Sequence, residues 1–257
     1  MKRALWALPV PIGIAILWSI AVSQQWITLI PSPIEVVKEM ADFTVGGVRR
    51  DAYSATFVTH LWASTGRVLA GFAAANAVAV PLGILLGRGK RLAAMIEPTL
   101  GVLRPIPVTA WVPLVLILFG LGSRSAVILI FIGSFFPILI NTIAGVKGVP
   151  RRLTEAAAML GTGDRAMLYK VVLPAALPSI FAGMRIALGL AWVVLVVGET
   201  VGVATGLGSV ITEAREVSRT EVIVTGMIFI GVAGLASDKL LTLLMRKVLG
   251  NRPLIVA

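Results

Sequence analysis

Residues 149–174 read VPRRLTEAAAMLGTGDRAMLYKVVLP, a polar and helix-forming stretch between two long apolar segments. The chain as a whole is 58% hydrophobic and only 14% charged, which leaves few places for soluble surface. A compact polar insert in such a chain predicts a docking element for a partner protein.

The apolar segments around this insert define the class of protein. The mean hydropathy is +0.96, and apolar runs repeatedly exceed the roughly 18 residues that indicate a membrane-spanning helix. The alternation and turn spacing of a membrane barrel are absent, and only helices or closed barrels satisfy the backbone in lipid. We therefore predict an all-α integral membrane protein.

The net charge of +11 is concentrated in loops on one side of the predicted bundle. These loops hold two acidic residues, Glu155 and Asp164, and thirteen basic ones: Lys2, Arg3, Arg88, Lys90, Arg91, Lys147, Arg151, Arg152, Arg165, Lys170, Arg246, Lys247 and Arg252. The other side is nearly balanced, with three basic and four acidic residues in 23–53. This asymmetry follows the positive-inside rule, so it predicts cytoplasmic N and C termini and argues against nucleic acid as a partner.

Several classes of chemistry are missing from the sequence. There is no cysteine and a single histidine, His60, which excludes disulfides, thiolate metal sites and a histidine cluster. The nearest approach to a phosphate-binding loop, Gly89-Lys90, has Ile84 in place of the first glycine and Arg91 after the lysine. We therefore expect no catalytic residues and no cofactor in this chain, and ATP bound by another chain.

The apolar pattern predicts six spans, over residues 5–22, 61–86, 99–121, 127–146, 177–201 and 222–244. We expect the first to be retained as a span, although Ala21-Val22-Ser23 also resembles a signal-peptide cleavage site. Residues 24–53 form an external segment with a short amphipathic helix over 34–40, for which Ser32 is the expected N-cap. An even number of spans agrees with two termini on one side.

Small residues recur at four-residue steps and predict faces where helices approach closely. One such stripe is Gly66, Ala70 and Ala74, and another is Gly183, Ala187 and Ala191. No convincing internal repeat is present, which weakens the case for an inverted-repeat secondary transporter.

The polar insert itself predicts two short helices. Thr154 is the expected N-cap of a helix over 155–160, and Gly161 is expected to end or bend it. A second helix over 164–172 would stop at Pro174. From composition alone, an ordinary cytoplasmic loop remains the alternative to a docking projection.

The fixed positions of this insert resemble the signature loop of the membrane subunits of bacterial ABC importers. The pattern is E-A-A, three residues, G, nine residues, a branched apolar residue, one residue and L-P, here Glu155-Ala156-Ala157, Gly161, Val171 and Leu173-Pro174. Matching framework segments over about residues 31–245 include Arg104-Pro105-Ile106-Pro107, Gly183-Met184-Arg185 and Gly198-Glu199-Thr200. They are similar to permeases for aliphatic sulfonates, taurine and nitrate.

This resemblance implies a type I permease fold in a bacterial inner membrane. Residues 1–257 would form one permease domain, with a first span in 1–22 and a core over 61–245 that carries a coupling loop at 150–174. It also implies a homodimer of this chain with two ATP-binding subunits and an external solute-binding protein. The contact with the ATPase would be made by Glu155, Ala156, Ala157, Gly161, Leu173 and Pro174.

Polar residues within the spans are the candidates for a substrate path, because burying them in lipid is costly. They are Arg104, Ser134, Asn141, Thr142, Arg185 and Glu199. Each has a structural alternative. Arg104 also suits the inner interface, Arg185 a pairing with another chain, and Glu199 a pairing with Arg67. The three uncharged residues also suit interhelical hydrogen bonds.

Two other function classes remain open at this point: a self-sufficient channel or secondary transporter whose insert is a private domain, and an ABC exporter subunit. The external amphipathic segment disfavours the exporter, because it offers an external protein a surface. The solute itself is not identified, since recognition in such importers rests mainly with the external protein.

Overall fold

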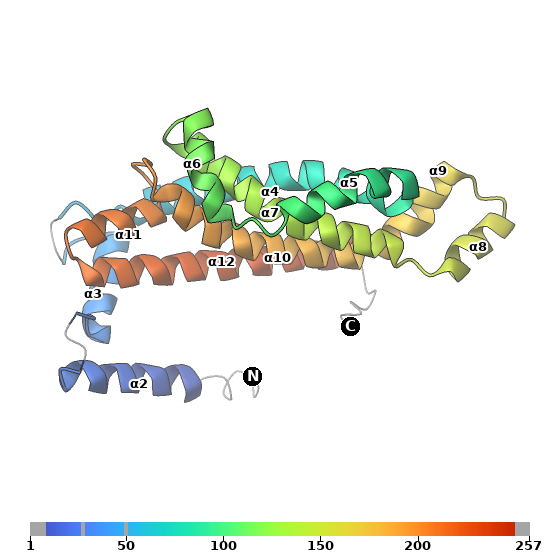
Figure 1. Ribbon diagram of the computed structural model, residues 1–257. Coiled ribbons are helices and arrows are strands. Elements are labelled where there is room, and N and C mark those ends of the chain that lie inside the picture. The colour runs from blue at the N-terminus through green and yellow to red at the C-terminus, as the bar shows by residue number, and fades with distance from the viewer. Residues whose placement is uncertain (1–8, 27–28, 49–50, 250–257) are drawn as a thin grey trace. The chain divides into compact units, whose positions relative to one another are not determined.

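The computed structural model describes residues 9–26, 29–48 and 51–249, and all regular elements in this part of the chain are helices (Figure 1). They form two compact units. The small unit comprises the described residues up to Ser64 together with Ala204–Val232, and the large unit comprises Thr65–Val203 and the residues from Ala233 onward. The predicted charges Lys2, Arg3, Arg49, Arg50 and Arg252 lie outside the described residues.

Four helical segments are long and apolar enough to cross a membrane. They are α4 (Phe57–Arg88), α7 (Ser123–Lys147), the run Asp164–Glu199 that ends in α10 (Leu173–Glu199), and α12 (Thr220–Leu249), whose apolar part is Thr220–Lys247. The first predicted span, 5–22, corresponds to α2 (Pro9–Ser23), a shorter apolar helix. Residues 5–8 of that predicted span lie outside the described residues. The structure is therefore that of a multi-pass membrane protein.

The third predicted span, 99–121, is wrong as a continuous helix. The chain instead forms α5 (Lys90–Leu103) and α6 (Val108–Phe119), whose axes differ by 95°. The break contains Pro105 and Pro107, which lack the N–H that would continue the helix, and Pro107 is extended at φ −63° and ψ 143°. If the bent pair counts as one span, the described residues supply up to five.

Helix α4 packs against α7 through a stripe of small residues that the sequence reading misplaced. The predicted stripe starts at Gly66, but a Cβ there would meet nothing within 4 Å, and Ala70 and Ala74 are exposed. The observed stripe is Gly71, Ala75, Ala79, Gly83 and Gly87, which repeats at the same four-residue step. Added Cβ atoms at the three glycines would lie 2.6 Å from Ile130, Thr142 and Val146.

Helix α10 packs against the neighbouring face of α7, and here the predicted stripe is confirmed. Ala187 and Ala191 are fully buried, and a Cβ at Gly183 would lie 2.6 Å from the Cβ of Asn141. Nearer the loop end, a Cβ at Gly145 of α7 would lie 2.7 Å from the Cβ of Ser179. Helix α7 is therefore held between α4 and α10 at distances that only small residues allow.

The α4–α7 contact yields a matched pair of variants. Gly83→Val places a branched side chain where a Cβ already overlaps Thr142, so we expect overpacking to destabilise the protein by about 1–3 kcal/mol. Gly66→Val, on the same helix but with open space, should cost less. Thermal unfolding in detergent measures both. Equal losses for the two variants would contradict the close α4–α7 packing.

In the small unit, the predicted short amphipathic helix is confirmed as α3 (Pro33–Val45), with Ser32 as its N-cap. The Glu35 backbone N–H donates to Ser32 Oγ at 3.4 Å, and the Ser32 N–H donates to Glu35 Oε2 at 2.7 Å. This reciprocal capping box fixes where the helix begins. The unit is completed by α11 (Leu207–Glu216) and the first turns of α4 and α12.

Candidate coupling loop and translocation cavity

The polar insert forms two short helices, as predicted: α8 (Arg151–Met159) and α9 (Asp164–Met167). Gly161 reverses the chain between them with φ +74°, a conformation that favours glycine. The Gly161 N–H donates to Ala158 O at 2.9 Å and the Thr162 N–H donates to Ala157 O at 3.1 Å. These two bonds close the C-terminus of α8 in a Schellman motif, which explains why the insert has a glycine at this position.

Two details of the predicted insert are wrong. Helix α8 begins at Arg151, after Pro150, so Thr154 lies inside the helix and its Oγ1 donates to Arg151 O at 2.8 Å. The second helix does not stop at Pro174 but runs through the π-helical turn η1 (Leu168–Val172) into α10. Pro174 lies in the first turn of α10, directly after the wider π turn, where a missing N–H is tolerated.

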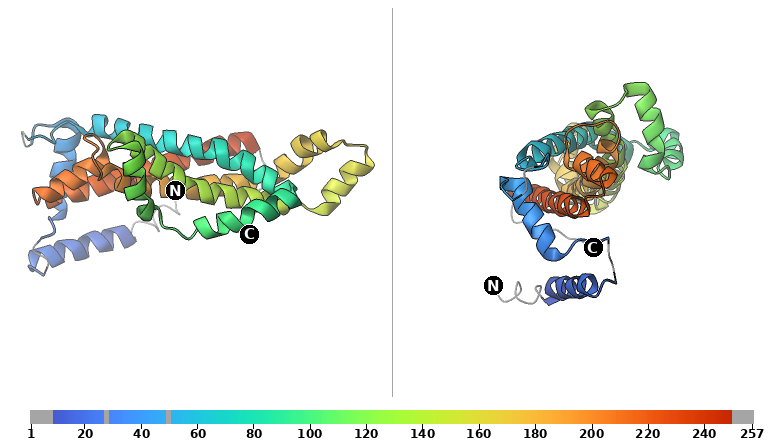
Figure 2. Two further views of the ribbon diagram at one scale, coloured as in Figure 1. Left: turned by 45° about the horizontal axis from the view of Figure 1, so that its top comes forward. Right: turned by 90° about the vertical axis from the view of Figure 1, so that its left-hand side faces the viewer.

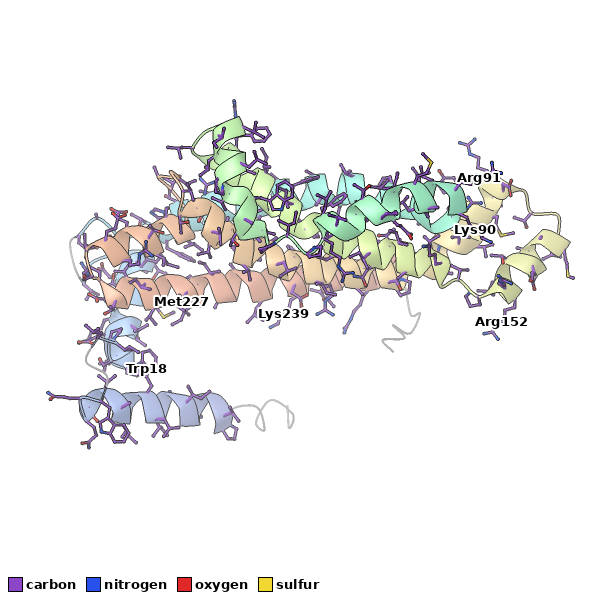
Figure 3. The ribbon with its side chains drawn as sticks, viewed as in Figure 1. Trp18, Lys90, Arg91, Arg152, Met227 and Lys239 are labelled. Atoms are coloured by element: carbon purple, nitrogen blue, oxygen red, sulfur yellow. The ribbon has the colours of Figure 1, made fainter. Side chains whose placement is uncertain are left out.

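The polar insert, the candidate coupling loop, projects past the ends of α5 and α7 (Figure 1 and left panel of Figure 2). Met159 is 89% and Leu160 86% exposed, and Leu153, Glu155 and Ala156 are exposed as well. Lys90, Arg91 and Arg152 lie at this same end of the large unit (Figure 3). The loop therefore combines exposed apolar side chains with a basic surround, the composition of a protein-binding surface.

An open cavity of about 430 Å³ lies beside the break between α5 and α6. It is lined by residues 104–108 of the break, by one face of α7 and by Ile186 and Leu190 of α10. Arg104 supplies the only charged side chain in this lining, and Asn141 supplies an amide. Pro105 and Pro107 interrupt the helix here, and α7 and α10 enclose the segment between α5 and α6 to form the cavity.

A second cavity of about 380 Å³ adjoins the first and shares Arg104, Phe136 and Ile140 with it. Glu97 and Lys147 line it and form an ion pair of 2.6 Å. Among the described residues, Arg104 forms no ion pair, so its guanidinium is the available positive charge of both cavities.

The uncharged candidates separate into two groups. Asn141 lines the first cavity, and its Nδ2 donates to Pro137 O at 2.8 Å. Ser134 and Thr142 line neither cavity and are fully buried. Thr142 donates to Ile138 O at 2.7 Å and faces Gly83 of α4, so the structure gives it a role in helix packing.

Glu199 and Arg67 form a buried ion pair, as the sequence reading allowed. Arg67 Nη1 donates to Glu199 Oε1 at 2.6 Å, and the two side chains are 8% and 0% exposed. Arg67 Nε also donates to Ser123 Oγ at 3.0 Å, at the first residue of α7. One guanidinium therefore joins α4 to the start of α7 and to the end of α10.

Removing one member of this pair leaves a buried charge without its partner, which typically costs about 3–5 kcal/mol. We expect Glu199→Leu and Arg67→Met each to lower the unfolding temperature strongly, and the double variant to be more stable than either. The exposed pair of Glu97 and Lys147 is the control, since Lys147→Met should cost about 1 kcal/mol or less. Additive losses in the double variant would show that the pair does not act as a unit.

Arg185 pairs within its own chain, with a residue that the sequence reading missed. Its Nε and Nη2 each donate to a carboxylate oxygen of Asp238 on α12 at 2.8 Å. Next to this pair, Trp192 Nε1 donates to Ser237 Oγ at 2.9 Å. An acidic residue within the predicted sixth span was a visible signal, because intramembrane charges are usually paired.

Comparison with known proteins agrees with this architecture. Residues 79–250 match the family model described as "Binding-protein-dependent transport system inner membrane component". The chain therefore belongs to this family of inner-membrane permease subunits of ABC importers, the family that the coupling-loop pattern resembles.

Curated relatives cover most of the chain. A Methanocaldococcus jannaschii protein with the name of an ABC transporter permease is 50% identical over 68% of this chain and 66% of that one. A Bacillus subtilis protein named for aliphatic sulfonate transport is 36% identical over 86% and 78%. A bicarbonate transport permease of Synechococcus elongatus is 35% identical over 93% and 87%.

Among solved structures, the MetNI methionine ABC transporter in an inward-facing conformation has a similar fold. The TM-score is 0.58 at 21% identity, over 72% of this chain and 94% of that one. At this identity the likeness concerns the fold alone, and it supports the type I permease architecture that the loop pattern implies.

Proposed function

We propose that two copies of this chain form the translocation path of an ATP-driven importer for a small oxyanion. Relatives of this chain are named for transport of aliphatic sulfonates, bicarbonate, taurine and nitrate, which are all small anions or carry an anionic group. The observation that carries the proposal is Arg104, whose charge lies in the two adjoining cavities and forms no ion pair among the described residues. A guanidinium suits a planar or tetrahedral oxyanion because its N–H groups donate in parallel.

Energy would come from two separate ATP-binding subunits, since the sequence has no phosphate-binding loop. In this proposal each ATPase binds the exposed apolar residues of α8, with Glu155, Ala156 and Ala157 at the contact. A movement of the bound ATPase would reach the substrate path through the coupling loop, because this loop links α7 to α10 and both helices line the first cavity. The end of the large unit that carries Lys90, Arg91 and Arg152 would then face the cytoplasm.

The Schellman turn offers a test of coupling with a matched control. Gly161→Ala forces a Cβ into a left-handed conformation, at a cost of about 1–2 kcal/mol, which should tilt α8 relative to α9. Gly163→Ala has the same open space at an ordinary φ of −70°. We expect Gly161→Ala to weaken binding of the ATPase and ATP-driven uptake several-fold, and Gly163→Ala to retain both.

These two variants are compared by co-purification with the ATP-binding subunits and by uptake in proteoliposomes with the external binding protein. A permease that transports without any ATPase, or that binds the ATPase equally well with both substitutions, would contradict coupling through this loop.

The anion path is tested at Arg104. Arg104→Gln removes the charge and leaves a shorter polar side chain. We expect maximal uptake of a sulfonate, taurine or nitrate to fall by about tenfold or more, because one charge-assisted contact of about 1.5–3 kcal/mol is lost. Arg104→Lys should retain part of the rate. Arg91→Gln, which removes a positive charge outside the cavities, is the control. Unchanged uptake in Arg104→Gln would remove this residue from the path.

A further inference from the structure

Helix α3 of the small unit turns an apolar face outward. Ile34, Val37, Ala41 and Val45 follow one another at three- and four-residue steps, which places them on one side of the helix. All four are exposed, and the larger three are 66%, 63% and 82% exposed. Lys38 is the only ionisable residue within this stripe.

Two of the three carboxylates of α3 are buried away from this stripe. Glu39 and Asp42 are 2% and 0% exposed. Asp42 accepts from the Val48 N–H at 2.7 Å and from Ser54 Oγ at 2.5 Å, while Glu39 lies 3.5 Å from Arg219. The buried side of α3 therefore combines these two carboxylates with the apolar Val36 and Phe43, while its exposed side carries the apolar stripe. A helix on a water-facing surface would turn its polar residues outward instead.

Arg219 explains how charges can be held on the inner side. Its guanidinium contacts Glu221 at 2.7 Å and Asp51 at 3.1 Å, and it lies 5.9 Å above the ring of Tyr53. Burial lowers the pKa of Arg219, but hydrogen bonds to Glu221 and Asp51 and the nearby charge of Glu39 outweigh it and raise the pKa overall. Arg219 thus links Glu39 of α3 to Asp51 and Glu221, and these contacts hold the Glu39 side of α3 towards the rest of the small unit.

Aromatic contacts determine where α3 lies along the lengths of α4 and α12. The ring of Phe43 is 5.7 Å from that of Phe57, the first residue of α4, and 5.7 Å from that of Phe229 in α12. These contacts place α3 beside the first turn of α4, at the end opposite the basic Arg88, and beside the third turn of α12. Helix α3 therefore lies near the end of α4 that is opposite Arg88.

Short connections on both sides keep α3 near α2 and the start of α4. Helix α2, an apolar helix, ends at Ser23, only ten residues before Pro33, and α4 begins twelve residues after Val45. Trp26, in the first of these connections, is 76% exposed, and tryptophan is enriched at membrane interfaces. A lysine such as Lys38 on a helix at the interface can direct its amine towards lipid phosphates.

We propose that α3 lies in the outer interface of the bilayer, with Ile34, Val37, Ala41 and Val45 in contact with lipid acyl chains. The lipid covers this face whether or not a binding protein is docked. Helix α3 then helps to fix the depth of the small unit in the membrane, together with the membrane-spanning helices. This inference does not depend on the transported solute or on the ATPase contact.

The absence of native cysteine makes single-cysteine variants straightforward. Val37→Cys and Val45→Cys sample the stripe, with Ile34→Cys as a third position should either variant fold poorly. Glu216→Cys, at an exposed acidic position of α11, is the water-exposed control. Each is spin-labelled in the full complex and reconstituted into vesicles of phosphatidylethanolamine and phosphatidylglycerol.

The measurement compares collisions with oxygen, which concentrates in lipid, and with a water-soluble nickel chelate. We expect the ratio of oxygen to nickel collisions to be several-fold higher at positions 37 and 45 than at 216, and unchanged when the liganded binding protein is added. A ratio like that of position 216 would overturn the inference. So would immobilisation of these labels only on addition of the binding protein, or spin–spin broadening between two copies of position 37.

Discussion

The rest of the large unit depends on how closely α7 is held between α4 and α10. In lipid there is no hydrophobic drive to associate helices, so contact depends on how near two backbones can come. The stripe from Gly71 to Gly87 on α4 and the stripe from Gly183 to Ala191 on α10 allow that approach from two sides. Helix α7 is thereby fixed along most of its length.

Both features that we associate with transport are attached to this packed group. The first cavity lies against α7 and α10, and the coupling loop joins the same two helices. In the proposed function, a displacement of the loop would be passed along α7 rather than absorbed locally, because this helix is closely packed. At the end opposite the loop, Arg67 of α4 contacts the start of α7 and the end of α10, so these three helices are also connected there.

The two units use polar residues in different ways. In the large unit, the pair of Arg185 and Asp238 and the pair of Arg67 and Glu199 join helices that are far apart in sequence. In the small unit, Arg219 gathers acidic groups on the inner side of α3, which leaves its outer side to apolar residues. In both units each of these charges has a partner of opposite sign. The Arg67–Glu199 pair is buried, whereas the side chains of Arg185 and Asp238 are 45% and 37% exposed.

Features that depend on near neighbours were determined by the sequence alone: the membrane class, the Ser32 cap, the reversal at Gly161 and the loop pattern that indicates the family. Four-residue periodicity could not tell Gly66 from Gly71 as the packing face, because only the rotation of α4 against α7 decides it. Likewise, Asp238 is separated from Arg185 by 53 residues, and it becomes a partner only once α10 and α12 are side by side. The tertiary structure also decided that the prolines near Arg104 open a cavity rather than kink a span, since that depends on which helices surround the break.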